Sequence, residues 1–484
     1  MQLADVPEIS GAVPFVGHAR TFRSERLGFL LRAAREQPEG GRLRVFGRDV
    51  FHTASPVVLH EVLVEKARLF EKSPVLRVVL YPLAGEGLFT SEGDLWKRQR
   101  RLMAPIFQSS AIARYVDIVA DVVERAADRW KPGVAIDLGR EMTRITMAIV
   151  GKSLFDADAF DEADALGDAL TVALEWSNQH LGSPRLAMQM RLRVLLESAE
   201  GRLPAALERG RASLLHGLRG PVLLAGARGP RLRNAIAILD DRIQRMIDER
   251  RSASTSRDDL LTRLLQARDE DGSRMDDRQV RDEAITLFVA GHETTATALT
   301  WALYRLAREP PLYSKLTVEA DALGGKEDFR DPARLSYAAK VFKEAMRLYP
   351  PVYLFSRRAR EAVTVADYDL PRRALVFASP YSVHRRPDVY PDPERFDPER
   401  FTPGAEAARP RCSYLPFGAG PRVCIGNHFA LMEGPIVLAA LARRLRFDVD
   451  EGPRIEPAPF ATLRPGAPVI ARVQWRVDRG ARSN

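Results

Sequence analysis

Apolar and polar residues recur with a helical period over most of the chain between residues 94 and 350. Apolar positions about three or four residues apart are typical of helices that bury one face. The longest predicted helix begins at Asp276 or Asp277, which are suitable N-caps, and ends before Pro310 and Pro311. The predicted helices are 26–37, 56–69, 95–101, 111–130, 137–155, 161–180, 231–251, 276–308, 336–348 and 427–446.

Two segments have strand-like patterns instead. Residues 42–54 alternate like a strand pair, and β-branched and aromatic residues dominate 352–384. We therefore predict a mainly α chain with a small β-rich part, chiefly in 42–60 and 352–384. Because these segments come from opposite ends of the chain, residues 1–484 are predicted to form one domain.

Two further segments carry many prolines. Residues 73–93 combine glycine and proline with large apolar residues, and we expect a long loop that covers a site. Residues 385–416 are predicted to form an irregular, proline-rich meander.

Composition and charge narrow the class of protein. The 484 residues are 45% hydrophobic, which is enough for a large core. The net charge of +9 comes mainly from arginines spread along the chain. This distribution predicts a basic face for an acidic partner or anionic lipid, and it does not favour nucleic-acid binding.

The sequence also bears on the compartment. It has no run of about 20 uncharged apolar residues, so we expect no transmembrane anchor. Prolines and glycines interrupt residues 1–17, and no signal peptide is expected. The two cysteines, Cys412 and Cys424, are predicted to stay reduced, which indicates a cytoplasmic protein.

The first candidate site is the glycine-rich stretch 417–426, which contains Cys424. Glycines allow close backbone approaches, and amides at the start of the next helix favour a thiolate. A single thiolate does not suit tetrahedral zinc, but it suits axial ligation of heme iron. The alternative is a buried structural cysteine, which would not explain the spaced glycines and Arg422.

The second candidate site lies in the middle of the longest helix. Gly291 costs about 1 kcal/mol there relative to alanine, and Thr294 and Thr295 can bond back to earlier carbonyls and bend the helix. Such a helix can lie close to a flat cofactor and hold water. The zinc motif that begins at His292 fails because position 296 is alanine. The alternative is a glycine tolerated in a buried helix.

These two stretches resemble the cytochromes P450. Residues 417–426 match every fixed position of the heme-binding signature F-x-x-G-x-R-x-C-x-G, and residues 290–295 are similar to the oxygen-activation segment A-G-x-[DE]-T-T. The resemblance implies the cytochrome P450 fold, with heme b between the long central helix and the helix after Cys424. It also implies that Thr294 supports the proton path to iron-bound dioxygen and that Glu293 connects this path to solvent.

The same resemblance implies further contacts to the heme. Trp96 and Arg100 match the pattern W-x-x-x-R, and Arg357 follows the proline turn where the family has an arginine, although Arg358 could replace it. Arginine and tryptophan supply donors for the heme propionates. The implied heme contacts are Cys424, which ligates the iron, and Trp96, Arg100, Arg357, Arg422, Phe417, Gly418, Ala290 and Gly291.

A third group is implied to be structural. Glu344 and Arg347 share one helix face, and in the family this pair forms a buried network with an arginine of the meander. Arg400 is the expected third member because of its F-x-P-x-R-F context, and Arg395 competes with it.

The resemblance predicts an oxidoreductase, a monooxygenase that hydroxylates a lipophilic small molecule with dioxygen and electrons from a separate ferredoxin or flavodoxin. A fatty acid or related lipid is the expected substrate, with terpenoids, steroids and polyketides as alternatives. A peroxygenase or hydroperoxide-rearranging enzyme and a non-catalytic heme sensor are the rival functions. The predicted pocket residues are Phe89, Leu287, Ala290, Val352, Leu354, Phe355 and Ala461.

Residues 183–228 depart from a minimal member of the family. They are rich in arginine and leucine and are interrupted by glycine and proline. We predict a lid insertion that gates substrate access or contacts a membrane surface. A solvated helical insertion and a disordered loop are the alternatives.

Overall fold

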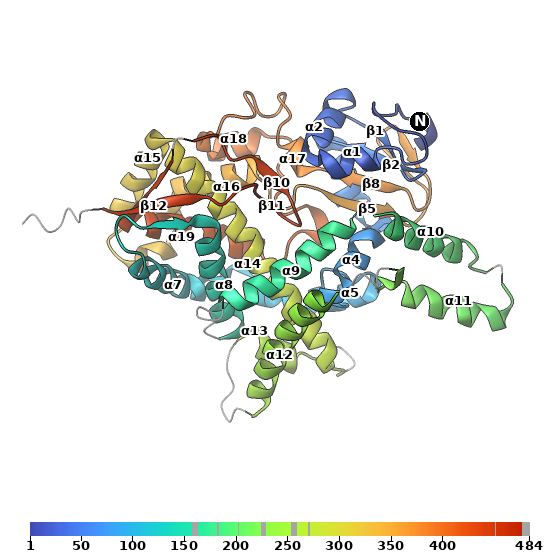
Figure 1. Ribbon diagram of the computed structural model, residues 1–484, viewed down its shortest axis with the longest axis horizontal. Helices are drawn as coiled ribbons and strands as arrows, with labels where there is room; N and C mark the ends of the chain where they lie inside the picture. Colours follow the sequence, from blue (N-terminus) through green and yellow to red (C-terminus); the bar gives the residue numbers. More distant parts are fainter. Residues whose placement is uncertain are drawn as a thin grey trace, which may run out of the picture.

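The computed structural model describes residues 1–156, 163–181, 183–201, 203–223, 229–252, 259–269, 272–450 and 452–476. Helices surround the long central helix α14; the strands β1, β2, β5 and β8 lie together at the right, and β12 lies at the left (Figure 1). The mainly α fold class is therefore confirmed. The α-helices are α1 (Ala19–Ser24), α2 (Arg26–Glu36), α3 (Pro56–His60), α4 (Pro74–Ala84), α5 (Gly93–Met103), α6 (Ser109–Ile112), α7 (Val116–Arg129), α8 (Leu138–Phe155), α9 (Ala163–His180), α10 (Pro184–Ser198), α11 (Ala205–Gly217), α12 (Pro230–Ser252), α13 (Leu260–Gln266), α14 (Asp277–Arg308), α15 (Pro310–Asp321), α16 (Ser336–Leu348), α17 (Pro380–Val383), α18 (Pro403–Ala408) and α19 (Asn427–Arg444).

The largest sheet has five strands in the order β1-β2-β8-β5-β3. Its β2–β8 pair is parallel and its other pairs are antiparallel. The sheet joins segments from opposite ends of the chain, and strands form in both predicted β-rich segments. The strands are β1 (Gly41–Val45), β2 (Arg48–Thr53), β3 (Phe70–Lys72), β4 (Ala135–Asp137), β5 (Phe355–Ala359), β6 (Val363–Val365), β7 (Tyr368–Leu370), β8 (Leu375–Ala378), β9 (Leu445–Val449), β10 (Pro457–Pro459), β11 (Leu463–Pro465) and β12 (Ile470–Trp475).

The central helix α14 has the boundaries that its capping residues predict. The Asp276 carboxylate accepts a hydrogen bond from the Gln279 amide at 2.8 Å, and the helix ends before Pro310. Helix α8 packs along it, and Trp301 of α14 is completely buried. This packing places the middle of α14 at the centre of the protein (Figure 1).

The prediction of a loop over residues 73–93 is wrong, because its first half is helix α4. Ser73 caps this helix by accepting the Val75 amide at 3.3 Å, and Pro74 lies in the first turn, where a missing N–H costs little. Pro82 lies in the last turn, and the helix ends at Gly85, which has φ +49°. The prolines that suggested a loop therefore stand at the two ends of a helix.

The insertion predicted over 183–228 contains helices α10 and α11, which project together from the body at the right of Figure 1. Residues 202 and 224–228 of that prediction lie outside the described residues. Its base is tied to the body, since the Gln189 amide donates to the Gly220 carbonyl at 2.6 Å and Glu197 pairs with Arg358 at 2.9 Å. The helical alternative therefore holds for the described part, and a gating role stays a prediction.

Candidate active site

The loop before α19 presents the thiol of Cys424. The Cys424 amide donates to the Phe417 carbonyl at 2.9 Å, and the Gly426 amide donates to the sulfur. Gly420 has φ +69°, and a Cβ atom there would lie 1.8 Å from the Leu63 carbonyl oxygen, so only glycine fits. The thiol is exposed, yet nearby protein desolvates it and raises its pKa, while the Gly426 amide and Arg100 oppose that rise.

The central part of helix α14 is buried apart from a short opening. Between Asp282 and Leu306 every residue is buried except Val289, Ala290, Gly291 and Thr294, and of these four Ala290 is the most exposed. Ile425, the neighbour of Cys424, packs against the apolar cluster that includes Leu287 and Phe288. Val289, in the opening, packs against the same cluster, so the opening and the thiol loop border one apolar cluster.

Gly291 also has a packing role that sequence analysis did not reveal. A Cβ atom at Gly291 would lie 3.0 Å from a methyl group of Val150 on α8. The glycine therefore lets α8 approach α14 closely. The neighbouring Thr294 hydroxyl donates to the Ala290 carbonyl at 2.8 Å, which is the backbone contact expected for that threonine.

A cluster of cations surrounds Glu92, the first residue before α5. Arg422 pairs with Glu92 at 2.5 Å and lies over the ring of Trp96 at 4.3 Å. Burial and, to a smaller extent, the charge of Arg422 lower the pKa of Arg357 to about 10, while Glu92 opposes this shift. Lys72, which belongs to no motif recognised in the sequence, is part of the same cluster, because Glu92, Arg422 and Arg357 are its electrostatic neighbours. Burial lowers the pKa of Lys72 to about 7, and Glu92 opposes that shift.

This cluster fits a group with two carboxylates. Arg357, Arg422 and Lys72 all have Glu92 as an electrostatic neighbour, and Arg422 Nη1 is buried without a hydrogen-bond partner among the described residues. Arg100 lies apart from Glu92, and its electrostatic neighbour is Cys424. The residues present therefore suit heme propionates on one side and an iron-bound thiolate on the other.

Arg358 does not belong to the cation cluster, so Arg357 is the better candidate of the two for a contact to the heme propionates. It pairs with Glu71 at 2.5 Å and with Glu197 at 2.9 Å.

Behind the thiol loop, Glu344 and Arg347 form an ion pair at 2.7 Å with both side chains completely buried. Glu344 also accepts the Asp397 amide at 2.7 Å and lies 3.7 Å from Arg400 Nε. Arg395 contributes only its carbonyl, which accepts from Arg347 at 3.0 Å. The structure thus brings Glu344, Arg347 and Arg400 together and leaves the side chain of Arg395 out.

Glu293 is held by two residues of the C-terminal β-hairpin that sequence analysis missed. The Thr462 hydroxyl donates to it at 2.7 Å, and Arg464 pairs with it at 2.5 Å. Burial opposes ionisation of Glu293, but Arg464, His292 and Thr462 outweigh it and lower the pKa of this carboxyl. An ionised carboxylate thus precedes the Thr294 hydroxyl, and together they can accept and return a proton.

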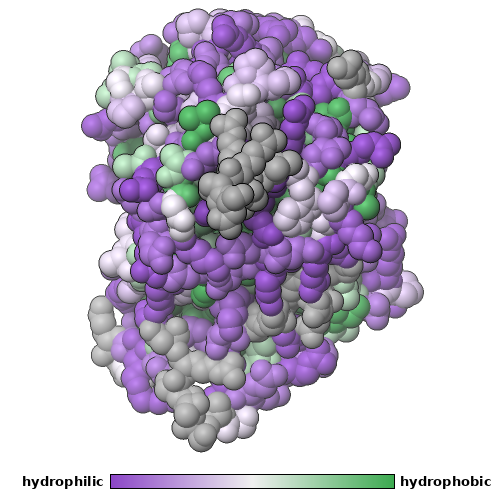
Figure 2. Space-filling model, turned by 90° about the vertical axis from the view of Figure 1, so that its left-hand side faces the viewer, coloured by the Kyte–Doolittle hydropathy of each residue, from purple (hydrophilic) through white to green (hydrophobic). Residues whose placement is uncertain are grey.

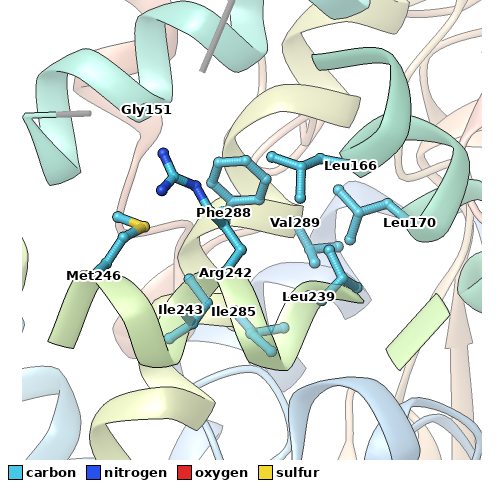
Figure 3. Close-up of a pocket in the computed structure, with 10 residues that line it drawn as sticks. All are labelled: Gly151, Leu166, Leu170, Leu239, Arg242, Ile243, Met246, Ile285, Phe288 and Val289. Carbon is cyan, nitrogen blue, oxygen red and sulfur yellow. The ribbon is translucent and has the colours of Figure 1, made fainter. Parts of the chain in front are cut away.

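The structure does not bring the predicted pocket residues together in one apolar cluster. Leu287 is buried, Phe89 and Val352 are exposed, and Leu354, Phe355 and Ala461 pack against three different apolar clusters. A small apolar cavity lies beside α14, with Phe288 and Val289 on one wall and Leu170 and Ile243 on the others (Figure 3). None of the predicted pocket residues lines this cavity, which lies among α8, α9, α12 and α14.

Comparison with known proteins defines the class. The family model described as Cytochrome P450 matches residues 7–209 and 221–469. This chain therefore belongs to the cytochrome P450 family, whose members are heme-thiolate monooxygenases that use heme b. The predicted enzyme class and cofactor are thereby confirmed.

Named relatives come from Streptomyces. Cyclooctatin synthase of Streptomyces melanosporofaciens is 34% identical over 94% of this chain and 93% of its own length. Pentalenene oxygenase of Streptomyces avermitilis is 32% identical over 94% of both chains. Cyclooctat-9-en-7-ol 5-monooxygenase of Streptomyces melanosporofaciens is 31% identical over 94% of this chain and 90% of its own.

Proposed function

We propose that this chain hydroxylates a terpenoid-class lipophile, with Cys424 as the iron ligand and Thr294 and Glu293 as the proton path. The observation that carries the proposal is the opening at Ala290 and Thr294 in a helix that is otherwise buried, matched by the exposed thiol of Cys424. The relatives are named for terpenoid oxygenation, which favours terpenoids over the fatty acid expected from sequence.

The side chains have distinct roles in this proposal. When bound, the heme supplies reductive activation of dioxygen, with two electrons from a separate ferredoxin or flavodoxin. Trp96, Arg357, Arg422 and Lys72 would hold its carboxylates. Glu293, ionised and held by Arg464, passes protons toward the Thr294 hydroxyl, while the apolar side chains of α14 keep bulk water away.

A substrate screen tests the function. Purified holoprotein is titrated with terpenoids and fatty acids by optical difference spectroscopy, and binders are incubated with dioxygen, a ferredoxin and its reductase. We expect hydroxylated product from a terpenoid. Product from hydrogen peroxide alone, with none from dioxygen and reductant, would instead support a peroxygenase.

Thr294→Ala is expected to lower hydroxylated product per reductant consumed by about tenfold or more, because the hydroxyl that relays protons is lost. Reductant use should continue and yield hydrogen peroxide. Thr300→Val is the matched control, since the Thr300 hydroxyl makes the same kind of bond to the carbonyl of Ala296, at 2.7 Å, two turns further along α14. Equal coupling in wild type and Thr294→Ala would contradict the proposed path.

We also propose that α10 and α11 contact anionic membranes. Met188, Leu192 and Leu195 form one exposed stripe on α10, and Leu195 is 67% exposed. Phe15 is 96% exposed. It lies near α10, because the carbonyl of its neighbour Val16 accepts the Phe46 amide, and the Phe46 carbonyl accepts a hydrogen bond from Arg191 of α10. The end of the molecule at the left of Figure 1 is mostly hydrophilic instead (Figure 2).

Vesicle sedimentation tests this contact. We expect the protein to bind vesicles that contain phosphatidylglycerol and to bind phosphatidylcholine vesicles less, because Arg185 and Arg191 are exposed beside the stripe. Leu192→Ser combined with Leu195→Ser should weaken binding roughly tenfold or more. Val318→Ser on α15, where Val318 is 71% exposed, is the control. Among the described residues, no helix is long and apolar enough to cross a bilayer.

A further inference from the structure

A second cavity, separate from the one in Figure 3, is lined mainly by charged side chains. It lies between β3, the first turn of α4, the segment before α5, α10 and β5. Its charged lining residues are Glu71, Lys72, Arg77, Glu92, Arg193 and Arg358. Four of these six carry basic groups, and they come from parts of the chain far apart in sequence.

Positive charge exceeds negative charge in the ion pairs around this cavity. Five arginines, Arg77, Arg193, Arg219, Arg358 and Arg373, share three carboxylates, Glu71, Glu86 and Glu197. Arg77 Nε and Arg193 Nη1 are buried and have no hydrogen-bond acceptor among the described residues. Buried donors without acceptors are costly, and an incoming anion would supply the missing acceptors.

The heme propionates do not account for this surplus. Lys72 and Glu92 belong to both the cavity and the cation cluster described above. Arg77 and Arg193 lie outside that cluster: Arg77 pairs with Glu86 and Arg193 pairs with Glu197, both at 2.9 Å, and other arginines share each of these carboxylates. The cavity therefore adjoins the cofactor cluster and has arginines that this cluster does not use.

The cavity also reaches the predicted substrate side. Phe89, one of the predicted pocket residues, lines it together with Leu76 of α4. The Lys72 ammonium donates to the carbonyls of Leu88 at 2.8 Å and Phe89 at 3.1 Å. A ligand with an anionic end at Arg77 and Arg193 would thus place its next carbons against apolar side chains.

We propose that this cavity binds the carboxylate of a lipophilic acid substrate, with Arg77 and Arg193 as the recognising groups. The inference rests on the proposed function and adds a carboxylate to its substrate, a terpenoid acid, with a fatty acid as the alternative skeleton that the test distinguishes. Arginine suits this task because its planar N–H groups match a carboxylate in geometry and charge. A neutral ester of the same acid keeps the apolar part and loses the charge.

The test is calorimetric titration of the full-length holoprotein at pH 8. The probes are abietic acid and methyl abietate, with dodecanoic acid and methyl dodecanoate as the fatty-acid arm. We expect at least one acid to bind about ten- to a hundredfold more tightly than its ester. The arm with the tighter acid identifies the carbon skeleton that the site prefers.

Arg77→Gln and Arg193→Gln should each remove most of this preference and leave ester affinity unchanged. Arg209→Gln, at an exposed position on α11, is the matched control and should keep the preference. Equal affinity of acid and ester in wild type, absence of acid binding, or equal weakening of both by Arg193→Gln would overturn the inference. Because calorimetry does not depend on turnover, hydroxylation of neutral terpenoids without acid preference would leave the proposed function standing.

Discussion

Replacing Cys424 with serine is expected to abolish the thiolate-type absorption band of the reduced, carbon monoxide-bound protein and to lower oxygenation roughly a thousandfold or more. The thiolate supplies electron density that assists cleavage of the dioxygen bond, and a serine hydroxyl does not. The measurements are the reduced carbon monoxide spectrum and product formation with dioxygen, a ferredoxin and its reductase.

Cys412→Ser is the control for this experiment. Cys412 is half-buried, and burial raises the pKa of its thiol to about 11, so it stays protonated at neutral pH and is a poor candidate for the ligand. The variant should keep both the band and the activity. Loss of the band in Cys412→Ser with its retention in Cys424→Ser would reverse the proposed ligation.

Glu344→Ala is expected to destabilise the protein by about 3–5 kcal/mol, because it leaves the buried guanidinium of Arg347 without its carboxylate. Arg347 would keep hydrogen bonds to the carbonyls of His384 and Pro393, which do not neutralise its charge. We expect a lower denaturant midpoint and a reduced ratio of bound heme to protein, measured by urea unfolding and by the heme absorbance of purified protein.

Glu399→Ala provides the comparison for Glu344→Ala. Glu399 is 44% exposed and pairs with Lys315 and Lys340, which are also partly exposed, and such pairs contribute about 0–1 kcal/mol. An unfolding midpoint for Glu344→Ala equal to that of Glu399→Ala would show that the buried pair does not support the heme loop.

The substrate interpretation changed between sequence and structure. The predicted pocket residues suggested a lipophile with no polar anchor, and a fatty acid was the expected substrate. The names of the relatives favour terpenoids, and the carboxylate site proposed at Arg77 and Arg193 would add a polar anchor. These arginines stand in α4 and α10, where helical sequence alone says nothing of what they face.

The sequence by itself determined the features that depend on neighbours in the chain. The caps of α14 and the bond from Thr294 to the Ala290 carbonyl act through local backbone geometry, and the motifs around Cys424 and Gly291 have fixed spacings, so the motif positions and most helices could be predicted. Helix α4 was missed because prolines usually indicate a loop. A proline destabilises a helix in its interior but is tolerated near its ends, and Pro74 and Pro82 both lie in terminal turns.

Only the tertiary structure decided the contacts between distant segments. Arg464 lies 171 residues from Glu293 and meets it because the C-terminal hairpin packs on α14. Lys72 joins the cation cluster, and Arg358 leaves it, through the pairing of β3 with β5. Packing and the burial of charge determine these partners, and the spacing of residues along the chain does not reveal them.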